Sequence, residues 1–163
     1  MRFTLLGAGL ALLAACTSAP APVPAPAPAM PQRVVSLDYC ADQFVLKLAD
    51  PAQIAAVSMH ADAPFSFLRA EAAAHAQVRA RTEDVIGLAP DLVVRAYGGG
   101  AQAGAMLSKA GIAVAQLDIA DDIDGVKANI RKLAAALGQP ARGAALIAEM
   151  EGGLAQIRRP EPG

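Results

Sequence analysis

From residue 33 to residue 157, short apolar runs rich in β-branched residues alternate with longer amphipathic segments. Runs of the first kind are typical of strands, and amphipathic segments with a period near 3.6 are typical of helices. The expected strands cover residues 34–37, 54–58, 92–94 and 112–117, with a short extended piece at Val78. The expected helices cover residues 41–48, 70–76, 82–88, 101–110, 124–137 and 141–157.

The order of these elements defines the fold class. Strands that alternate with helices predict an α/β domain, here a Rossmann-like lobe with a short parallel sheet flanked by helices. Thr82 is expected to cap one helix, with Glu83 in its first turn, where a carboxylate favours the helix dipole. That helix is expected to end near Leu88, because Pro90 disfavours helical geometry in the residue before it.

Side chains that could bind a ligand follow three of the expected strands. In open parallel sheets, ligands bind beyond the carboxyl ends of the strands. The candidate ligand-binding residues at those ends are Asp38, Tyr39, Cys40, His60, Arg95 and Tyr97. Both tyrosines of the chain fall there, as do Phe65 and Phe67. We expect aromatic stacking and a charge-assisted hydrogen bond from Arg95 to bind the ligand.

The glycines after the third strand do not form a phosphate loop. Residues 98–104 follow a strand and open a helix, but position 103 is Ala and no Gly-Lys-Ser/Thr follows. We therefore interpret 98–100 as a flexible turn that lets a ligand or partner approach. The aspartates at 118–124 do not match a calcium loop, because its glycine and terminal glutamate are out of register. Helix capping explains them better.

Catalytic motifs are also missing. The chain has no G-x-S-x-G elbow. Cys40 could act as a nucleophile with His60 or His75 as its base, but nothing in the sequence places them together. The two histidines lack a neighbouring carboxylate cluster, so a metal site is not expected. We expect no enzyme activity, no resident metal and no cofactor.

The N-terminus predicts export. Arg2 gives a short positive start, residues 3–15 are apolar, and Leu-Ala-Ala precedes Cys16. This run is too short to span a bilayer and has the form of a cleaved signal peptide at residues 1–15. The cysteine at the cut point resembles that of a bacterial lipoprotein, in which Cys16 would be lipidated; an ordinary secretory signal is the alternative. Six of the twelve prolines lie within residues 20–31, so residues 16–32 are expected to form a stiff linker.

The charge and cysteine content of the chain limit the partners and the covalent links that can be expected. Without the signal the formal charge is −2, and no basic block or zinc spacing is present, so nucleic acid is not expected as a partner. Once Cys16 is acylated, Cys40 is the only remaining thiol, and no internal disulfide can form.

Four segments carry a family resemblance. They are RVVSLDYCADQFVLKLADPAQIAAVS, RTEDVIGLAPDLVV, LSKAGIAVAQLD and DDIDGVKANIRKLAAALGQPARGAALIAEM, which together span most of residues 32–158. In this order they resemble the N-terminal lobe of periplasmic substrate-binding proteins that serve ABC importers of iron–siderophore complexes, haem and vitamin B12. Such proteins hold the ligand between two α/β lobes joined by one long helix.

The resemblance implies a domain plan and a function. Residues 33–140 would be the N-terminal lobe, 141–158 the connecting helix and 159–163 a frayed end, with the second lobe absent. A fragment, a truncated product and a protein completed by a partner all remain open. The expected function is delivery of an iron–siderophore-type chelate to an inner-membrane ABC permease. A cobalamin or haem carrier and a truncated lipoprotein that binds no ligand are the alternatives. Glu83 matches the position at which this family docks an arginine of the permease, although the helix dipole alone also explains an acidic residue there.

The signal sequence generates one prediction. We expect labelled palmitate to be incorporated into the wild-type chain in a bacterial host, and the protein to fractionate with membranes in the periplasm. Cys16→Ala should abolish the label and leave uncleaved precursor or released protein, whereas Cys40→Ala, the control, should keep it. An unlabelled wild-type chain would contradict lipidation.

Overall fold

The computed structural model describes residues 30–157. The predicted signal peptide, Cys16, most of the predicted linker and residues 158–163 lie outside the described residues. Among the residues that it describes, no helix is long and apolar enough to cross a bilayer.

Five parallel strands form one sheet in the order β3-β2-β1-β4-β5. The strands are β1 (Val34–Ser36), β2 (Ile54–Ser58), β3 (Gln77–Val78), β4 (Leu92–Arg95) and β5 (Ala113–Gln116). The helices are α1 (Tyr39–Leu48), α2 (Arg69–Ala72), α3 (Thr82–Gly87), α4 (Ala103–Lys109), α5 (Ile123–Ala136) and α6 (Pro140–Ala155). The α/β class and the parallel sheet predicted from the sequence are confirmed.

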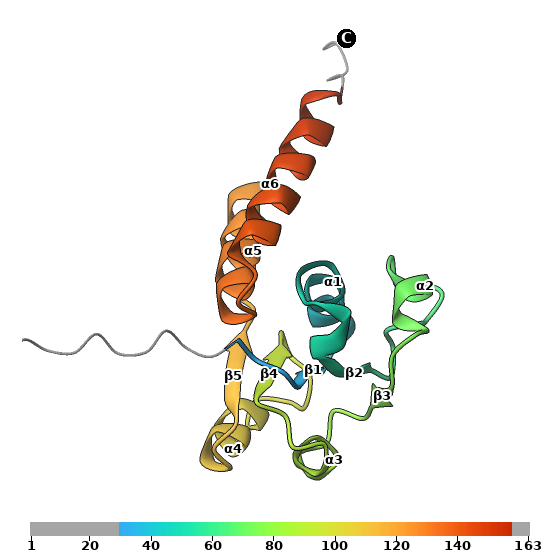
Figure 1. The fold of residues 1–163 in the computed structure, drawn as a ribbon, viewed down its shortest axis with the longest axis vertical. Coiled ribbons are helices and arrows are strands. Elements are labelled where there is room, and N and C mark those ends of the chain that lie inside the picture. The colour runs from blue at the N-terminus through green and yellow to red at the C-terminus, as the bar shows by residue number, and fades with distance from the viewer. Residues whose placement is uncertain (1–29, 158–163) are drawn as a thin grey trace, which may run out of the picture.

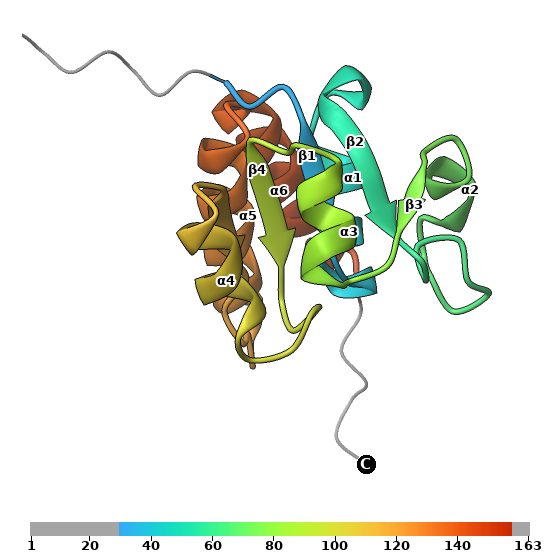
Figure 2. The same cartoon turned by 90° about the horizontal axis from the view of Figure 1, so that it is seen from below.

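Both faces of the sheet are covered. Helices α1 and α5 lie on one face and α3 and α4 on the other, while α6 packs against α5 (Figures 1 and 2). The alternation of side chains along each strand builds the two cores. Val34 and Val94 belong to the core under α1 and α5, whereas Val35 and Val93 belong to the core under α3 and α4.

Some element boundaries differ from the expectation. Thr82 is not a cap: it is the first residue of α3, and the cap position is taken by Arg81, whose side chain makes no capping bond. Ala89 adopts φ +45°, which ends that helix before Pro90 as expected. Helix α2 has only four residues, and α4 begins at Ala103 because Gly99 and Gly100, both at φ +79°, keep the preceding loop out of helical geometry.

The start of the described chain is attached to the lobe. The amide of Gln53 donates to the carbonyl of Pro31 at 2.6 Å, and the backbone nitrogens of Gln32 and Arg33 donate to Asp91 at 2.7 and 3.0 Å. Residues 31 and 32, which we assigned to the linker, therefore pack against the globular body.

The first half of helix α6 packs into the core, and its second half is attached by Met150, which packs on that core, and by an ion pair between Glu151 and Lys127 of α5 at 3.1 Å. Gly143 and Ile147 are its buried residues, and beyond Met150 every described residue is exposed. Figure 1 shows this second half extending past the end of α5. A Cβ atom added at Gly143 would lie 2.4 Å from the Cβ of Ala134, so the absence of a side chain allows α5 and α6 to approach.

This contact leads to a test. Gly143→Ala should lower the free energy of unfolding by roughly 1–3 kcal/mol, because the new methyl group meets a rigid one on α5. Gly152→Ala on the same helix is the matched control, since nothing lies within 4 Å of its added Cβ. That change should raise stability by roughly 0.5–1 kcal/mol through its helix propensity. Urea unfolding measures both; equal effects would contradict the close approach.

Candidate ligand site at the carboxyl edge of the sheet

Exposed aromatic side chains line the carboxyl edge of the sheet. Tyr39 begins α1, His60 and Phe65 lie on the loop between β2 and α2, and Tyr97 lies on the loop after β4. The ring of Tyr39 contacts Phe65 edge-on at 5.5 Å between centroids and Tyr97 at 6.1 Å, and His60 lies 6.4 Å from Phe65. We call these four residues the aromatic row. The structure thus brings together three predicted ligand-binding residues and one neighbouring phenylalanine.

Asp38 lies beneath this row and is 3% exposed. Its Oδ1 accepts a hydrogen bond from the backbone nitrogen of Ala41 at 2.9 Å, which caps α1. Its Oδ2 accepts from three consecutive backbone nitrogens, those of Ala96, Tyr97 and Gly98, at 2.7, 3.1 and 2.9 Å. Four donors occupy the carboxylate, so we revise its role from ligand contact to support of the loop.

Arg95 is also turned inward and is 7% exposed. Its Nε donates to the carbonyl of Gly98 at 2.9 Å, one terminal nitrogen donates to the carbonyl of Gly100 at 2.7 Å, and the other donates to Oε1 of Gln116 at 2.8 Å. All three guanidinium nitrogens are engaged within the protein. The expected bond from Arg95 to the ligand is therefore not supported, and the residue braces the loop that carries Tyr97.

The glycines of this loop do not make it loose. A Cβ at Gly98 would lie 2.3 Å from the carbonyl oxygen of Leu37, so the loop packs directly against the end of β1. Together with the bonds from Asp38 and Arg95, this contact pins residues 96–100. The interpretation of 98–100 as a flexible turn is wrong.

Two polar residues of α1 hold the other aromatic loop. The buried carboxylate of Asp42 accepts from the nitrogen and the hydroxyl of Ser58 at 3.0 and 2.6 Å, at the end of β2. Burial raises the pKa of Asp42, and the hydrogen bonds from Ser58 oppose that shift. Gln43 donates to the hydroxyl of Ser66 at 3.0 Å and accepts from the nitrogen of Leu68 at 3.1 Å. Both ends of the loop between His60 and Leu68 are thereby attached to α1.

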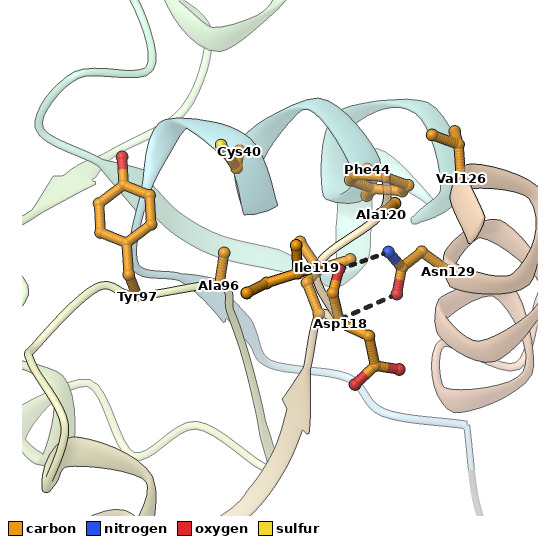
Figure 3. A pocket seen from close by; sticks show the side chains of 10 residues that line it. Cys40, Phe44, Ala96, Tyr97, Asp118, Ile119, Ala120, Val126 and Asn129 are labelled. Carbon is orange, nitrogen blue, oxygen red and sulfur yellow. Dashed lines mark hydrogen bonds between the residues drawn. The ribbon is translucent and has the colours of Figure 1, made fainter. Parts of the chain in front are cut away.

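An apolar cavity of about 490 Å³ adjoins Tyr97. It opens between the start of α1, the ends of β4 and β5 and the first turns of α5 (Figure 3). Its walls are formed by Cys40, Phe44, Ala96, Tyr97, Leu117, Asp118, Ile119, Ala120, Val126 and Asn129. Most of these side chains are apolar. Only Cys40 and Tyr97 among them are ligand-binding residues predicted from the sequence.

The loop that closes this cavity is also held rigidly. The buried amide of Asn129 accepts from the backbone nitrogen of Asp118 at 3.0 Å and donates to its carbonyl at 2.9 Å (Figure 3). Asp122 caps α5 by accepting from the nitrogen of Gly125 at 2.7 Å, as the capping interpretation predicted. Ile119, between these two anchors, is 93% exposed. An isoleucine presented in this way offers apolar contact to a ligand or a second surface.

Cys40 lines the same cavity. Its thiol is half-buried, and burial raises its pKa, with a further contribution from the charge of Asp38. A neutral thiol is a poor nucleophile. The contacts of Cys40 therefore favour an apolar wall over catalysis.

Comparison with known proteins identifies the family of the chain. Residues 34–161 match the family model described as periplasmic binding protein. The chain belongs to the periplasmic binding protein family. Its family membership was predicted correctly, and a family of binding proteins agrees with the expected binding role. No curated protein sequence matches the chain.

Solved structures of periplasmic binding proteins share the fold. The haem-binding protein RhuT from Roseiflexus sp. RS-1, in its apo form, is 25% identical with a TM-score of 0.63, over 79% of this chain and 52% of that one. A periplasmic haem-binding protein from Pseudomonas aeruginosa is 24% identical with a TM-score of 0.65, over 77% and 45%. The vitamin B12 binding protein BtuF of Vibrio cholerae is 21% identical with a TM-score of 0.62, over 77% and 49%. This periplasmic binding protein spans about half the length of these relatives.

Glu83 is exposed in the first turn of α3. That helix follows β3, so it begins near the same carboxyl edge as the aromatic row but on the opposite face of the sheet from α1 (Figure 2). Next to it, Asp84 forms an ion pair with Arg79 at 3.1 Å. The carboxylate of Glu83 is thus presented to solvent near the carboxyl edge of the sheet in this periplasmic binding protein.

Proposed function

We propose that this lobe forms one wall of a binding site for a large metal chelate of the tetrapyrrole class, with haem as the favoured ligand. The observation that carries this proposal is the continuity of two apolar surfaces at Tyr97, which belongs both to the aromatic row and to the 490 Å³ cavity wall. Ligand sites of this kind are concave and mostly apolar, with a few polar groups that orient the ligand.

The donor atoms of the row suit haem iron. Phenolate and imidazole are both axial ligands of haem iron in proteins. Tyr39, Tyr97 and His60 are all exposed at this edge and offer those groups. Partial desolvation of its hydroxyl and the neighbouring Tyr39 raise the pKa of Tyr97, so this phenol would have to release a proton to bind ferric iron. The haem-binding RhuT, at 25% identity, supports the same ligand class.

The revised position of Arg95 changes the balance between ligands. An iron–siderophore complex was favoured because a free arginine would suit an anionic chelate. Since the guanidinium is engaged by Gly98, Gly100 and Gln116, that argument no longer applies.

A ligand titration tests the proposal. We expect the full chain to bind hemin with a shifted Soret band. Tyr97→Ala should weaken binding about tenfold or more, because a half-exposed aromatic side chain supplies roughly 1–3 kcal/mol of contact when covered. Met106→Ala is the control, since Met106 is similarly exposed but lies on α4, away from the row. Parallel titrations use cyanocobalamin and a ferric siderophore.

Each alternative has a distinct result in this experiment. Binding of cyanocobalamin without hemin binding would replace haem by cobalamin as the ligand. Selective binding of the ferric siderophore would restore the earlier expectation. Binding of none of the three would favour a truncated lipoprotein that binds no ligand and would contradict the proposed function.

We further propose that the protein acts in the periplasm, tethered through Cys16, and delivers its ligand to an ABC permease through Glu83. Exposure at the rim and membership of the family support this role. Glu83→Gln should leave hemin affinity and stability unchanged, while association with the permease in proteoliposomes slows and depends less on salt. Glu71→Gln, an exposed glutamate on α2, is the control. An unaltered association rate would leave only the helix-dipole explanation.

A further inference from the structure

Tyr97 lies on a loop whose sequence suggests mobility, yet its backbone is held at every residue from 96 to 98. Three glycines follow Tyr97, and its ring is 55% exposed, so side-chain packing alone does not fix it. The Oδ2 atom of Asp38 supplies the missing constraint by accepting all three backbone N–H groups. Successive N–H groups that converge in this way form a concave site for an anion, and here the protein's own carboxylate occupies it.

The same carboxyl group also determines where Tyr39 lies. Tyr39 directly follows Asp38 in the chain and is the first residue of α1, whose start is capped by Oδ1 of Asp38. One oxygen of Asp38 therefore fixes the helix that carries Tyr39, and the other fixes the loop that carries Tyr97. The two rings meet edge-on at 6.1 Å above that carboxylate.

Arg95 reinforces the loop from the other side. It engages the carbonyls of Gly98 and Gly100, while Asp38 engages the nitrogens of residues 96–98. Donors and acceptors of the same five-residue segment are thus satisfied by two buried charged side chains. Both side chains are too deeply buried to contact a ligand at the surface.

We propose that Asp38 is a positioning residue that pre-organises the Tyr39–Tyr97 pair for ligand binding. This inference rests on the proposed function only for the ligand; the positioning itself is a property of the free protein. A pair that is already fixed loses less conformational freedom when a ligand covers it, so pre-organisation is converted into affinity.

Asp38→Asn separates positioning from folding. Asn is as good an N-cap as Asp, so α1 should remain capped. Its side chain carries no negative charge and directs an amide N–H₂ toward the three N–H donors, or offers them a single neutral oxygen. Asp91→Asn is the matched control. The side chain of Asp91 also accepts hydrogen bonds from two backbone nitrogens, but it lies at the amino end of β4, away from the aromatic row. Gly98→Ala disturbs the same loop by a separate route, through Leu37.

The first readout requires no ligand. The chain contains no tryptophan and only these two tyrosines, so near-UV circular dichroism reports chiefly on this pair. We expect Asp38→Asn and Gly98→Ala to lose much of the tyrosine signal and the hydrogen-exchange protection of residues 96–98, with far-UV spectra and cooperative unfolding retained. Asp91→Asn should keep both. An unchanged tyrosine signal and unchanged protection in Asp38→Asn would overturn the inference.

The second readout is hemin affinity in a double-mutant cycle. Asp38→Asn should weaken binding about tenfold, and the double variant with Tyr97→Ala should bind no more weakly than Tyr97→Ala alone, because Asp38 acts through Tyr97. Additive losses would show that Asp38 does not act by positioning that ring. If the wild type binds no hemin, the proposed function fails, while the ligand-free readout still decides whether Asp38 positions the pair.

Discussion

A single buried carboxylate joins the parts of this lobe that meet at the carboxyl edge of the sheet. Asp38 ends the connection after β1, caps α1 and holds the backbone after β4, so two segments about 60 residues apart in sequence share one charged group. Hydrogen bonds to an ionised acceptor are about twice as strong as neutral ones. Four donors also compensate the cost of removing the charge from water, because a carboxylate is buried favourably only when its lone pairs are satisfied.

The first two turns of α1 extend this principle to the neighbouring loop. Asp42 and Gln43 hold the loop that carries His60 and Phe65, as Asp38 holds the loop that carries Tyr97. The segment from 38 to 43 therefore has polar groups directed into the protein and Tyr39 directed outward. The hydrogen bonds of these buried polar side chains thus support the exposed aromatic row. A fully satisfied polar network of this kind fixes one geometry more specifically than an apolar core does.

The sequence predicted the architecture better than the direction of individual side chains. Strand and helix alternation was sufficient for the parallel sheet, and the rule that ligands bind at carboxyl ends located the two tyrosines correctly at one edge. Arg95 was misjudged although a signal existed: along β4 it has the parity of Val93, which faces α3 and α4, so alternation alone directs it inward. Thr82 failed as a cap because the choice between adjacent residues depends on backbone geometry that composition does not encode.

Other features of the site had no signal in a single sequence. Phe44 and Val126 line the same cavity only because α1 and α5 lie on the same face of the sheet. The periodicity of the sequence predicts that both side chains are buried, but it does not predict that the two helices are neighbours. The need for glycine at position 98 arises from the carbonyl of Leu37, which lies 61 residues earlier in the chain. The local sequence pattern suggests that such a glycine makes the backbone flexible, whereas here the missing side chain allows the backbone to pack closely against Leu37.

The close approach of α5 and α6 at Gly143 also has a mechanical consequence. The helix is buried near its start and exposed beyond Met150, where an exposed ion pair between Glu151 and Lys127 still links it to α5. A change in the crossing angle of the two helices would therefore pivot at their closest contact, between Gly143 and Ala134. From Gly143 to Ala155 the helix runs about 18 Å, so a change of about 10° in the crossing angle moves its far end by about 3 Å. A change in angle too small to disturb the core of the lobe thus becomes, at the far end of α6, a displacement as long as a hydrogen bond.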